Sequence, residues 1–263
     1  MATGKLLIGT SGYDYPEWKP DFYPPKTARA KFLEYYATQF NAIELNGTYY
    51  RMPSAQQMQN MIDRTGGKVQ FSIKAFQDLT HNPHIGNYQQ LIGEFKKALE
   101  PLQENNVLLC VLFQFPQSFH YDKPQRLYLD AILKEAVDLP LVVEMRNVKW
   151  QNDNVYQSLR QRNIGWCISD SPALPDLPKL DFTVTSGLAY FRLHGRNAEL
   201  WYKGDSKTRY DYLYSDSELQ PMIDPIRYLL ANAEIVSIFF NNHAKSQATI
   251  NAKKLEMMLQ GVE

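Results

Sequence analysis

Short apolar runs recur along the whole chain, separated by stretches with helical spacing or by polar loops. The runs cover residues 6–10, 42–46, 69–74, 107–115, 141–146, 164–170, 189–194 and 235–241. Consecutive parallel strands need a crossover between them, so this alternation predicts a parallel sheet with helices packed on it. Eight strand–helix units in 263 residues fit an α/β fold with a single closed (β/α)8 barrel of the TIM type, which we expect to form one domain over residues 1–263.

Two of the expected helices carry a recognisable start. Ser54 with Gln57, and Ser217 with Gln220, have the spacing of a capping box, in which each side chain bonds the backbone N–H of the other residue. We therefore expect helices to begin at Ser54 and at Ser217. Residues 171–186 contain three prolines and are expected to form a loop with little helix.

An open doubly wound sheet is the alternative architecture. No Gly-x-Gly-x-x-Gly fingerprint follows the first apolar run, and the sequence contains no P-loop. The missing motifs disfavour that architecture. They also disfavour enzymes that depend on NAD or on a P-loop nucleotide site.

The charge balance restricts the partners. Lys and Arg together number 28, as do Asp and Glu, whereas coating nucleic acid or an anionic membrane requires a positive field. The overall charge does not exclude a local basic patch that binds nucleic acid. The sequence does not indicate the oligomeric state. The sequence shows no apolar stretch of about 20 residues and no long apolar run at its start, so we expect neither a membrane span nor a signal peptide. Cys110 and Cys167 lie in apolar runs, which predicts buried free thiols and a reducing, cytoplasmic location.

Polar residues gather where the predicted strands end. In a parallel barrel the carboxyl ends of all strands meet at one mouth, where the active sites of TIM barrels lie. The residues expected there are Glu44, Asn46, Ser72, Lys74, Gln114, Glu144, Arg146, Asp170, Arg192, His194 and Asn241. Charged groups at this depth need partners or a ligand, so ion pairs that only support the upper barrel are the structural alternative.

The leading functional hypothesis is an enzyme, a hydrolase or an isomerase, that acts on a small, polar, anionic substrate such as a sugar or nucleotide derivative. Its candidate catalytic residues, which would perform acid–base chemistry, are Glu44, Glu144, Asp170 and His194. Its candidate substrate-binding residues are Lys74, Gln114, Arg146, Arg192, Asn241, Tyr13, Trp18, Tyr49, Arg209 and Tyr210.

Two further hypotheses use the same mouth. A metal-dependent enzyme would bind Mg, Mn or Zn through the side chains of Glu44, Glu144, Asp170 and His194. A non-catalytic protein would instead recognise nucleic acid or a nucleotide by stacking bases on its aromatic rings. Its phosphate contacts would come from Arg196, Lys203, Lys207 and Arg209.

A long loop follows the seventh apolar run, over residues 195–216. Loops of this length in a compact domain are usually functional lids or disordered segments, and Trp201 and Tyr210 offer apolar area that argues against disorder. We expect this loop to help cover the mouth, with a flap that only shields the upper core as the alternative. The turn that contains His81 and His84 is expected to be a surface loop rather than a metal site.

Several short motifs are recognisable as a set. They are Gly9-Thr10-Ser11-Gly12-Tyr13, Glu44-Leu45-Asn46, Tyr49-Tyr50-Arg51-Met52-Pro53, Gln114-Phe115-Pro116, Glu144-Met145-Arg146 and Tyr190-Phe191-Arg192-Leu193-His194-Gly195-Arg196. Together they resemble the YecE-like family, also called domain of unknown function 72, over nearly the whole chain. The resemblance implies a TIM-type barrel and no established activity. Asn147 stands where relatives often carry His, so no histidine chemistry is expected at that position.

Overall fold

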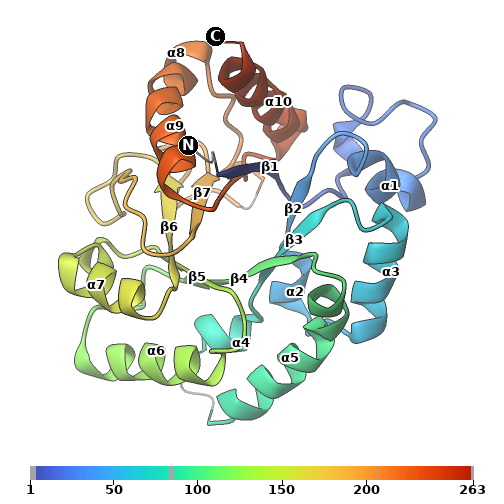
Figure 1. Cartoon of the computed structure of the whole chain (residues 1–263). Helices are drawn as coiled ribbons and strands as arrows, with labels where there is room; N and C mark the ends of the chain where they lie inside the picture. Colours follow the sequence, from blue (N-terminus) through green and yellow to red (C-terminus); the bar gives the residue numbers. More distant parts are fainter. Residues whose placement is uncertain (1–3, 83–85, 206, 262–263) are drawn as a thin grey trace.

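A closed barrel of parallel strands stands at the centre of the computed structural model, which describes residues 4–82, 86–205 and 207–261 (Figure 1). The strands are β1 (Lys5–Ser11), β2 (Ala42–Leu45), β3 (Gln70–Lys74), β4 (Leu108–Phe115), β5 (Leu141–Met145), β6 (Gly165–Asp170), β7 (Leu188–Leu193) and β8 (Ile235–Phe240). They follow one another around the barrel in chain order, and β1 closes the ring by pairing with β8. The predicted (β/α)8 fold is confirmed. His84 lies outside the described residues.

Helices form an outer ring around the strands (Figure 1). They are α1 (Phe32–Tyr36), α2 (Gly47–Tyr50), α3 (Ala55–Thr65), α4 (Gln77–Thr80), α5 (Tyr88–Glu104), α6 (Lys123–Glu135), α7 (Asp153–Gln161), α8 (Asp216–Leu219), α9 (Ile223–Asn232) and α10 (Gln247–Gln260). Short 3-10 helices occupy Pro16–Trp18, Arg29–Lys31, Val148–Trp150, Gln220–Met222 and Ala244–Ser246. Across the described ranges, no helix combines the length and the apolar character that a membrane crossing requires.

The interior of the barrel is apolar at its base and polar at its top. Alternate residues of a strand face the same side of the sheet, so each strand sends every second residue inward. Leu7, Cys110 and Cys167 belong to the buried apolar cluster inside the ring. The inward residues that follow them toward the carboxyl ends include Glu44 and Arg192. This sequence order places the polar side chains together at one end of the barrel.

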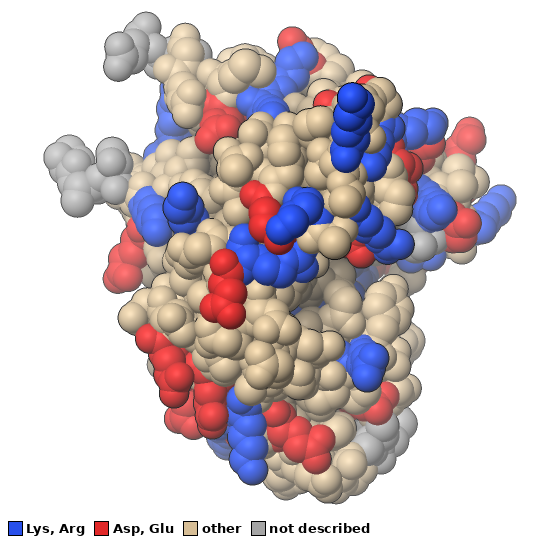
Figure 2. Space-filling model, turned by 90° about the vertical axis from the view of Figure 1, so that its right-hand side faces the viewer, with Lys and Arg blue, Asp and Glu red and all other residues tan. Residues whose placement is uncertain are grey.

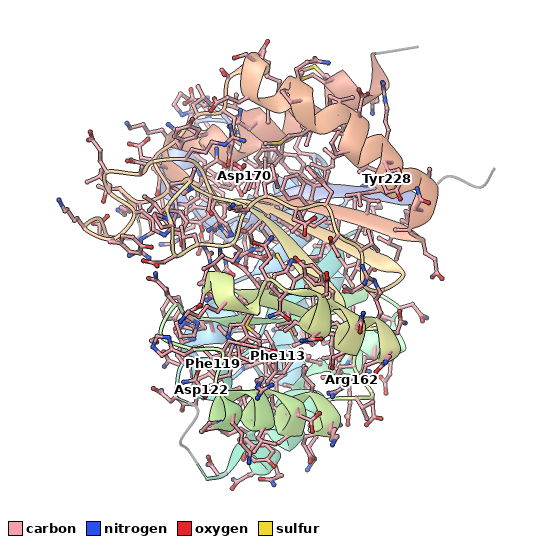
Figure 3. All side chains as sticks on the ribbon, turned by 90° about the vertical axis from the view of Figure 1, so that its left-hand side faces the viewer. Phe113, Phe119, Asp122, Arg162, Asp170 and Tyr228 are labelled. Carbon is pink, nitrogen blue, oxygen red and sulfur yellow. The ribbon has the colours of Figure 1, made fainter. Side chains whose placement is uncertain are left out.

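A second, larger core fills the space between the strands and the outer helices. Phe113 and Phe119 belong to it, and Phe119 stacks on Trp150 with ring centroids 5.3 Å apart. Figure 3 shows Asp122 and Asp170 on the side of the molecule where the strands end. Arg162 and Tyr228 lie on the opposite side, where the strands begin. The barrel axis therefore runs across this view, from the side of Arg162 and Tyr228 to the side of Asp122 and Asp170.

One of the two predicted helix starts is confirmed and the other is wrong. Ser54 and Gln57 form a capping box at the start of α3. The second box is formed by Ser215 and Glu218, not by Ser217 and Gln220. Glu218 accepts the backbone N–H of Ser215 at 2.9 Å, and a carboxylate is the stronger acceptor near the positive end of a helix, which moves the start two residues upstream.

Candidate functional site

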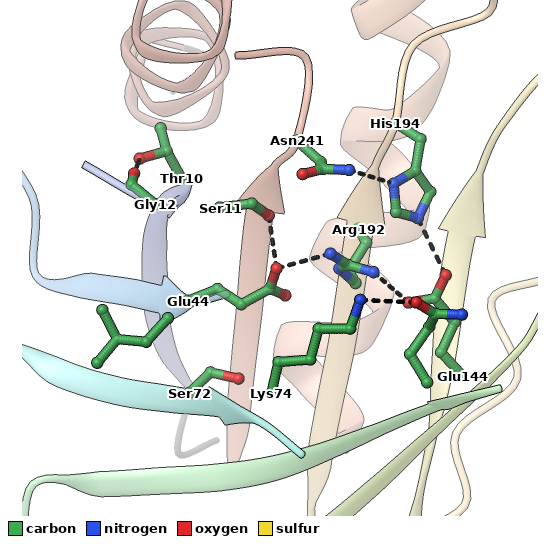
Figure 4. Close-up of polar contacts among 12 residues, drawn as sticks. Thr10, Ser11, Gly12, Glu44, Ser72, Lys74, Glu144, Arg192, His194 and Asn241 are labelled. Carbon is green, nitrogen blue, oxygen red and sulfur yellow. Dashed lines mark hydrogen bonds and ion pairs between the residues drawn. The ribbon is translucent and has the colours of Figure 1, made fainter. Parts of the chain in front are cut away.

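Arg192 occupies the centre of the polar layer at the mouth, between two carboxylates from different strands (Figure 4). Its Nη2 donates to Glu44 Oε1 at 2.6 Å, and its Nη1 pairs with Glu144 Oε2. Both carboxylates are fully buried and the Arg192 side chain is 2% exposed. A buried guanidinium between two carboxylates satisfies charges that would otherwise be costly at this depth.

Glu44 has a full set of partners below the mouth. Ser11 Oγ donates to its Oε1 at 2.7 Å, and the Tyr190 hydroxyl donates to its Oε2 at 2.7 Å. The Tyr190 hydroxyl also lies 2.6 Å from Ser72 Oγ. These bonds join β1, β2, β3 and β7 across the barrel, so Glu44 supports the floor of the mouth rather than facing it.

Glu144 is held ionised by its neighbours. Arg146 Nε lies 2.6 Å from Glu144 Oε1, on the side opposite Arg192. Burial raises the pKa of Glu144, but Arg146 and Arg192 outweigh that effect and hold this pKa well below its ordinary value. An ionised carboxylate cannot donate a proton near neutral pH but can accept one, so the expected part of Glu144 in acid–base work stays a prediction, as a base rather than as an acid.

His194 is fully buried beside Glu144. The Asn241 amide nitrogen lies 3.0 Å from its Nδ1. Its Nε2 lies 3.0 Å from Arg146 Nη2 and 3.2 Å from Glu144 Oε1. Burial and the charge of Arg146 lower the pKa of His194 to about 3. The ring is therefore neutral at pH 7, which does not favour the expected role as a proton carrier, and that role stays a prediction.

A cavity of about 380 Å³ opens above this layer. The predicted binding residues that line it are Lys74, Gln114, Arg146, Arg192, Asn241, Tyr49 and Tyr210. The lining residues absent from the predicted set are Tyr15, Glu17, Asn46, Tyr50, Lys207 and His243. None of the four candidate catalytic residues is among the described residues that line it. The structure thus brings the binding candidates together and places the acid–base candidates beneath or beside them.

Lys74 stands at the end of β3 with its ammonium group in the cavity wall. Its Nζ donates to Gln114 Oε1 at 2.8 Å and lies 4.2 Å from the centre of the Tyr49 ring. Burial and the nearby charge of Arg192 lower the pKa of Lys74 to about 7. Lys74 therefore gains and loses a proton in the neutral range, which no other predicted site residue is shown to do.

The charges of the layer do not cancel. Lys74, Arg146 and Arg192 supply three positive charges, while Glu44 and Glu144 supply two negative ones. His194 is neutral, and the further cavity residues Glu17 and Lys207 offset each other. One positive charge is left over when Lys74 is protonated, so the cavity is suited to an anion.

Asp170 faces away from the mouth. Cys167 and Ser169 point into the barrel, so the alternation along β6 turns Asp170 to the outside of the sheet. There it accepts from Arg196 Nη2 at 2.8 Å and from the Tyr214 hydroxyl at 2.5 Å. Its expected catalytic place in the mouth is wrong, and its carboxylate instead anchors the segment after β7.

That segment covers part of the mouth, as expected. Lys207 and Tyr210 line the cavity, and the Trp201 ring lies over Arg146 at 5.5 Å. Arg209 does not line the cavity, and its Nη2 contacts the backbone oxygen of Gly204 at 3.5 Å.

Two aromatic candidates near the amino terminus lie elsewhere than expected. Trp18 is fully buried and donates its indole N–H to the His243 backbone oxygen at 2.7 Å, so it supports Tyr15 from below. Tyr13 lines a neighbouring groove instead of the cavity. Strand alternation could not distinguish these rings from Tyr15, because none of them lies in a strand.

The expected metal ligands do not converge. Arg192 separates Glu44 from Glu144, and Asp170 lies on the outer face of β6. Among the described residues, no group of three or more His, Cys, Asp or Glu side chains could hold a metal ion. Asn147, where no histidine chemistry was expected, caps the 3-10 helix Val148–Trp150 by accepting the Lys149 backbone N–H at 3.0 Å.

Fold and site together define a TIM-barrel protein with a cationic cavity at the carboxyl ends of its strands. The chain belongs to the family described as "Protein of unknown function DUF72", which matches residues 7–263. It is 28% identical to the UPF0759 protein YunF of Bacillus subtilis over 97% of this chain and 94% of that protein.

Solved structures of DUF72 proteins share the fold. The crystal structure of a member from Thermotoga maritima has a TM-score of 0.91 and 34% identity, covering 97% of this chain and 99% of that one. A member from Enterococcus faecalis has a TM-score of 0.86 and 25% identity, covering 97% of this chain and 95% of that one. The resemblance noted in the sequence is confirmed.

Proposed function

We propose that this protein is an enzyme of the hydrolase or isomerase type that binds a small anionic substrate, related to a sugar or a nucleotide, in the cavity at the mouth. The unbalanced positive charge of Lys74, Arg146 and Arg192 carries the proposal. A phosphate or carboxylate group next to them restores the charge balance. Arg192 is fixed by two carboxylates, so the site is organised before the ligand arrives.

Lys74 is the group proposed to transfer protons. Its pKa of about 7 makes both protonation states accessible at neutral pH, as a general acid or base requires. Its Nζ is held by Gln114 at the cavity wall, where a bound substrate would lie. The carboxylates proposed from sequence take a supporting role, because both are enclosed by their partners.

A non-catalytic protein that binds nucleotides or nucleic acid is the second candidate, favoured by the rings of Tyr49 and Tyr210 at the cavity. Aromatic rings of this kind stack on bases. On the face drawn in Figure 2, however, positive and negative side chains are intermixed. This view shows a side of the barrel and not its mouth, and the balance of 28 basic and 28 acidic residues in the chain favours a small ligand over a long phosphate backbone.

The test is to incubate the protein with sugar phosphates, sugar acids and nucleotides and to follow each compound by NMR. The enzyme hypothesis predicts conversion of one class. It also predicts that Lys74→Met weakens binding and lowers the rate at saturating substrate at least 100-fold, because the variant loses both a cation and the proton-transferring group. Lys97→Met, at an exposed position on α5, serves as the control. Saturable binding without conversion would establish the non-catalytic candidate instead. Absence of binding for every anion would refute both.

A further inference from the structure

A groove of about 620 Å³ adjoins the cavity. One wall is the loop after β1, with Tyr13 and Tyr15, and the other is formed by α2 and α3. Met58 and Met61 contribute apolar surface to it. The groove therefore has a different chemical character from the cationic cavity beside it.

The two spaces share one wall. Tyr15, Asn46 and Tyr50 line both the groove and the cavity. The Tyr15 ring is fixed by stacking on His243, with centroids 4.8 Å apart, and by its hydroxyl, which donates to the Ser11 backbone oxygen at 2.9 Å. Tyr50, in contrast, is 70% exposed and offers its ring to solvent. A ligand longer than the cavity can thus continue directly into the groove.

Asn46 lies where the groove meets the cavity, and the oxygen of its side-chain amide lacks a hydrogen-bond donor in the described part of the chain. Its Oδ1 is buried without a hydrogen-bond partner among the described residues. A buried acceptor without a partner is costly, and the terminal amide of Asn rotates readily, so a ligand N–H or O–H at the junction would supply the missing bond.

Size favours one ligand across both spaces. The cavity of about 380 Å³ alone lies near the lower end of the roughly 300–1,000 Å³ that ligand pockets span. A phosphate group would fill only part of it. The groove adds aromatic and thioether surface of the kind that receives flat rings.

We propose that the substrate is a phosphate ester carrying a flat ring, of the size of a nucleoside monophosphate. The phosphate lies in the cavity at Lys74, Arg146 and Arg192, the ring lies in the groove against Tyr13 and Tyr50, and a hydroxyl or amine between them bonds Asn46. This assignment rests on the proposed function, because it uses the same cationic cavity for the phosphate.

Four probes separate the two ends of the ligand: inorganic phosphate, ribose 5-phosphate, adenosine and adenosine 5′-monophosphate. Calorimetric titration should give the monophosphate at least tenfold higher affinity than phosphate or ribose 5-phosphate. Adenosine should bind more weakly than the monophosphate. Asn46→Ala should lower the affinity for the monophosphate about fivefold, as expected for one neutral hydrogen bond.

A blocking variant tests the groove directly. Gly47 lines it, and a Cβ built there meets no atom within 4 Å, so Gly47→Phe should fill groove space without disturbing the core. The monophosphate should then bind only as well as inorganic phosphate, whose affinity should not change. Gly93→Phe on α5, where a Cβ also meets no atom within 4 Å, should change neither affinity. Thermal melting checks that both variants fold.

The outcomes distinguish the two proposals. If phosphate binds but the monophosphate binds no tighter, or if Gly47→Phe leaves the monophosphate affinity unchanged, the groove assignment is wrong and the anion cavity stands. If neither the monophosphate nor phosphate binds, both the proposed function and the groove assignment are wrong.

Discussion

At the scale of single residues, Arg192 compensates the charges of two buried carboxylates, Glu44 and Glu144. It is the only one of the three mouth cations that contacts both buried carboxylates. Removing one partner of a buried ion pair leaves an uncompensated charge, which costs far more than losing a surface pair.

Replacing Arg192 with Met should therefore lower the free energy of unfolding by about 3–5 kcal/mol, because Glu44 and Glu144 would remain buried together. Urea titration measures this change. Arg162→Met is the matched control, since Arg162 pairs with Asp130 at the partly exposed surface and should cost about 1 kcal/mol or less. A loss below about 1 kcal/mol for Arg192→Met would show that the pairs contribute little.

The two thiols give a second prediction at this scale. Cys110 and Cys167 are free and buried, as the sequence predicted, and burial raises the pKa of both thiols. The thiolate is the reactive form, so native protein should react with Ellman's reagent far more slowly than unfolded protein. Fast modification of both under native conditions would mean that the barrel interior opens readily.

Residue placement could be predicted from sequence where strand alternation determines it. Lys74, Gln114 and Arg192 were assigned to the mouth because each follows apolar residues at the carboxyl end of a strand. The same alternation, counted from Cys167, would have turned Asp170 to the outer face. The hydrogen bond from Tyr214 to Asp170 joins residues that lie 44 positions apart, and no local sequence pattern predicts such a pair.

At the scale of elements, the segment between β7 and α8 contains no helix or strand among its described residues. Gly195 has a φ of 87°, which favours glycine, and its backbone N–H donates to the Tyr214 hydroxyl at 2.8 Å. Asp170 and Arg196 hold the start of the segment to β6. The length of the loop was evident from sequence, but its position over the cavity depends on these long-range bonds.

The segment gives a prediction that separates two neighbouring residues. Tyr210→Ala should weaken ligand binding about tenfold with little change in melting temperature, because Tyr210 lines the cavity. Arg209→Ala should leave binding nearly unchanged, because Arg209 does not line the cavity and its Nη2 bonds Gly204 in the same loop. Anion titration and thermal melting of both variants measure these effects. Equal binding losses, or a large drop in melting temperature for Tyr210→Ala, would assign the segment a structural role.

At the scale of the whole molecule, the barrel concentrates charge that its sequence balances overall. The chain has 28 basic and 28 acidic residues, yet the described mouth contains one more positive than negative charge. The low pKa of Lys74 follows first from its burial and then from the nearby charge of Arg192, since a further buried cation is disfavoured until an anion arrives. Anion binding should therefore be coupled to proton uptake at Lys74.

Calorimetric titration with sulfate at pH 6 and pH 8 tests this coupling most directly, because sulfate keeps its charge across that range. Free Lys74 has a pKa of about 7, so its protonated fraction falls as the pH rises, and the bound anion restores the proton. Sulfate should bind about tenfold more weakly at pH 8 than at pH 6, with a proton taken up at pH 8, and Lys74→Met should remove both effects. Equal affinity at the two pH values, without proton uptake, would contradict the account of the cavity as an anion site balanced by Lys74.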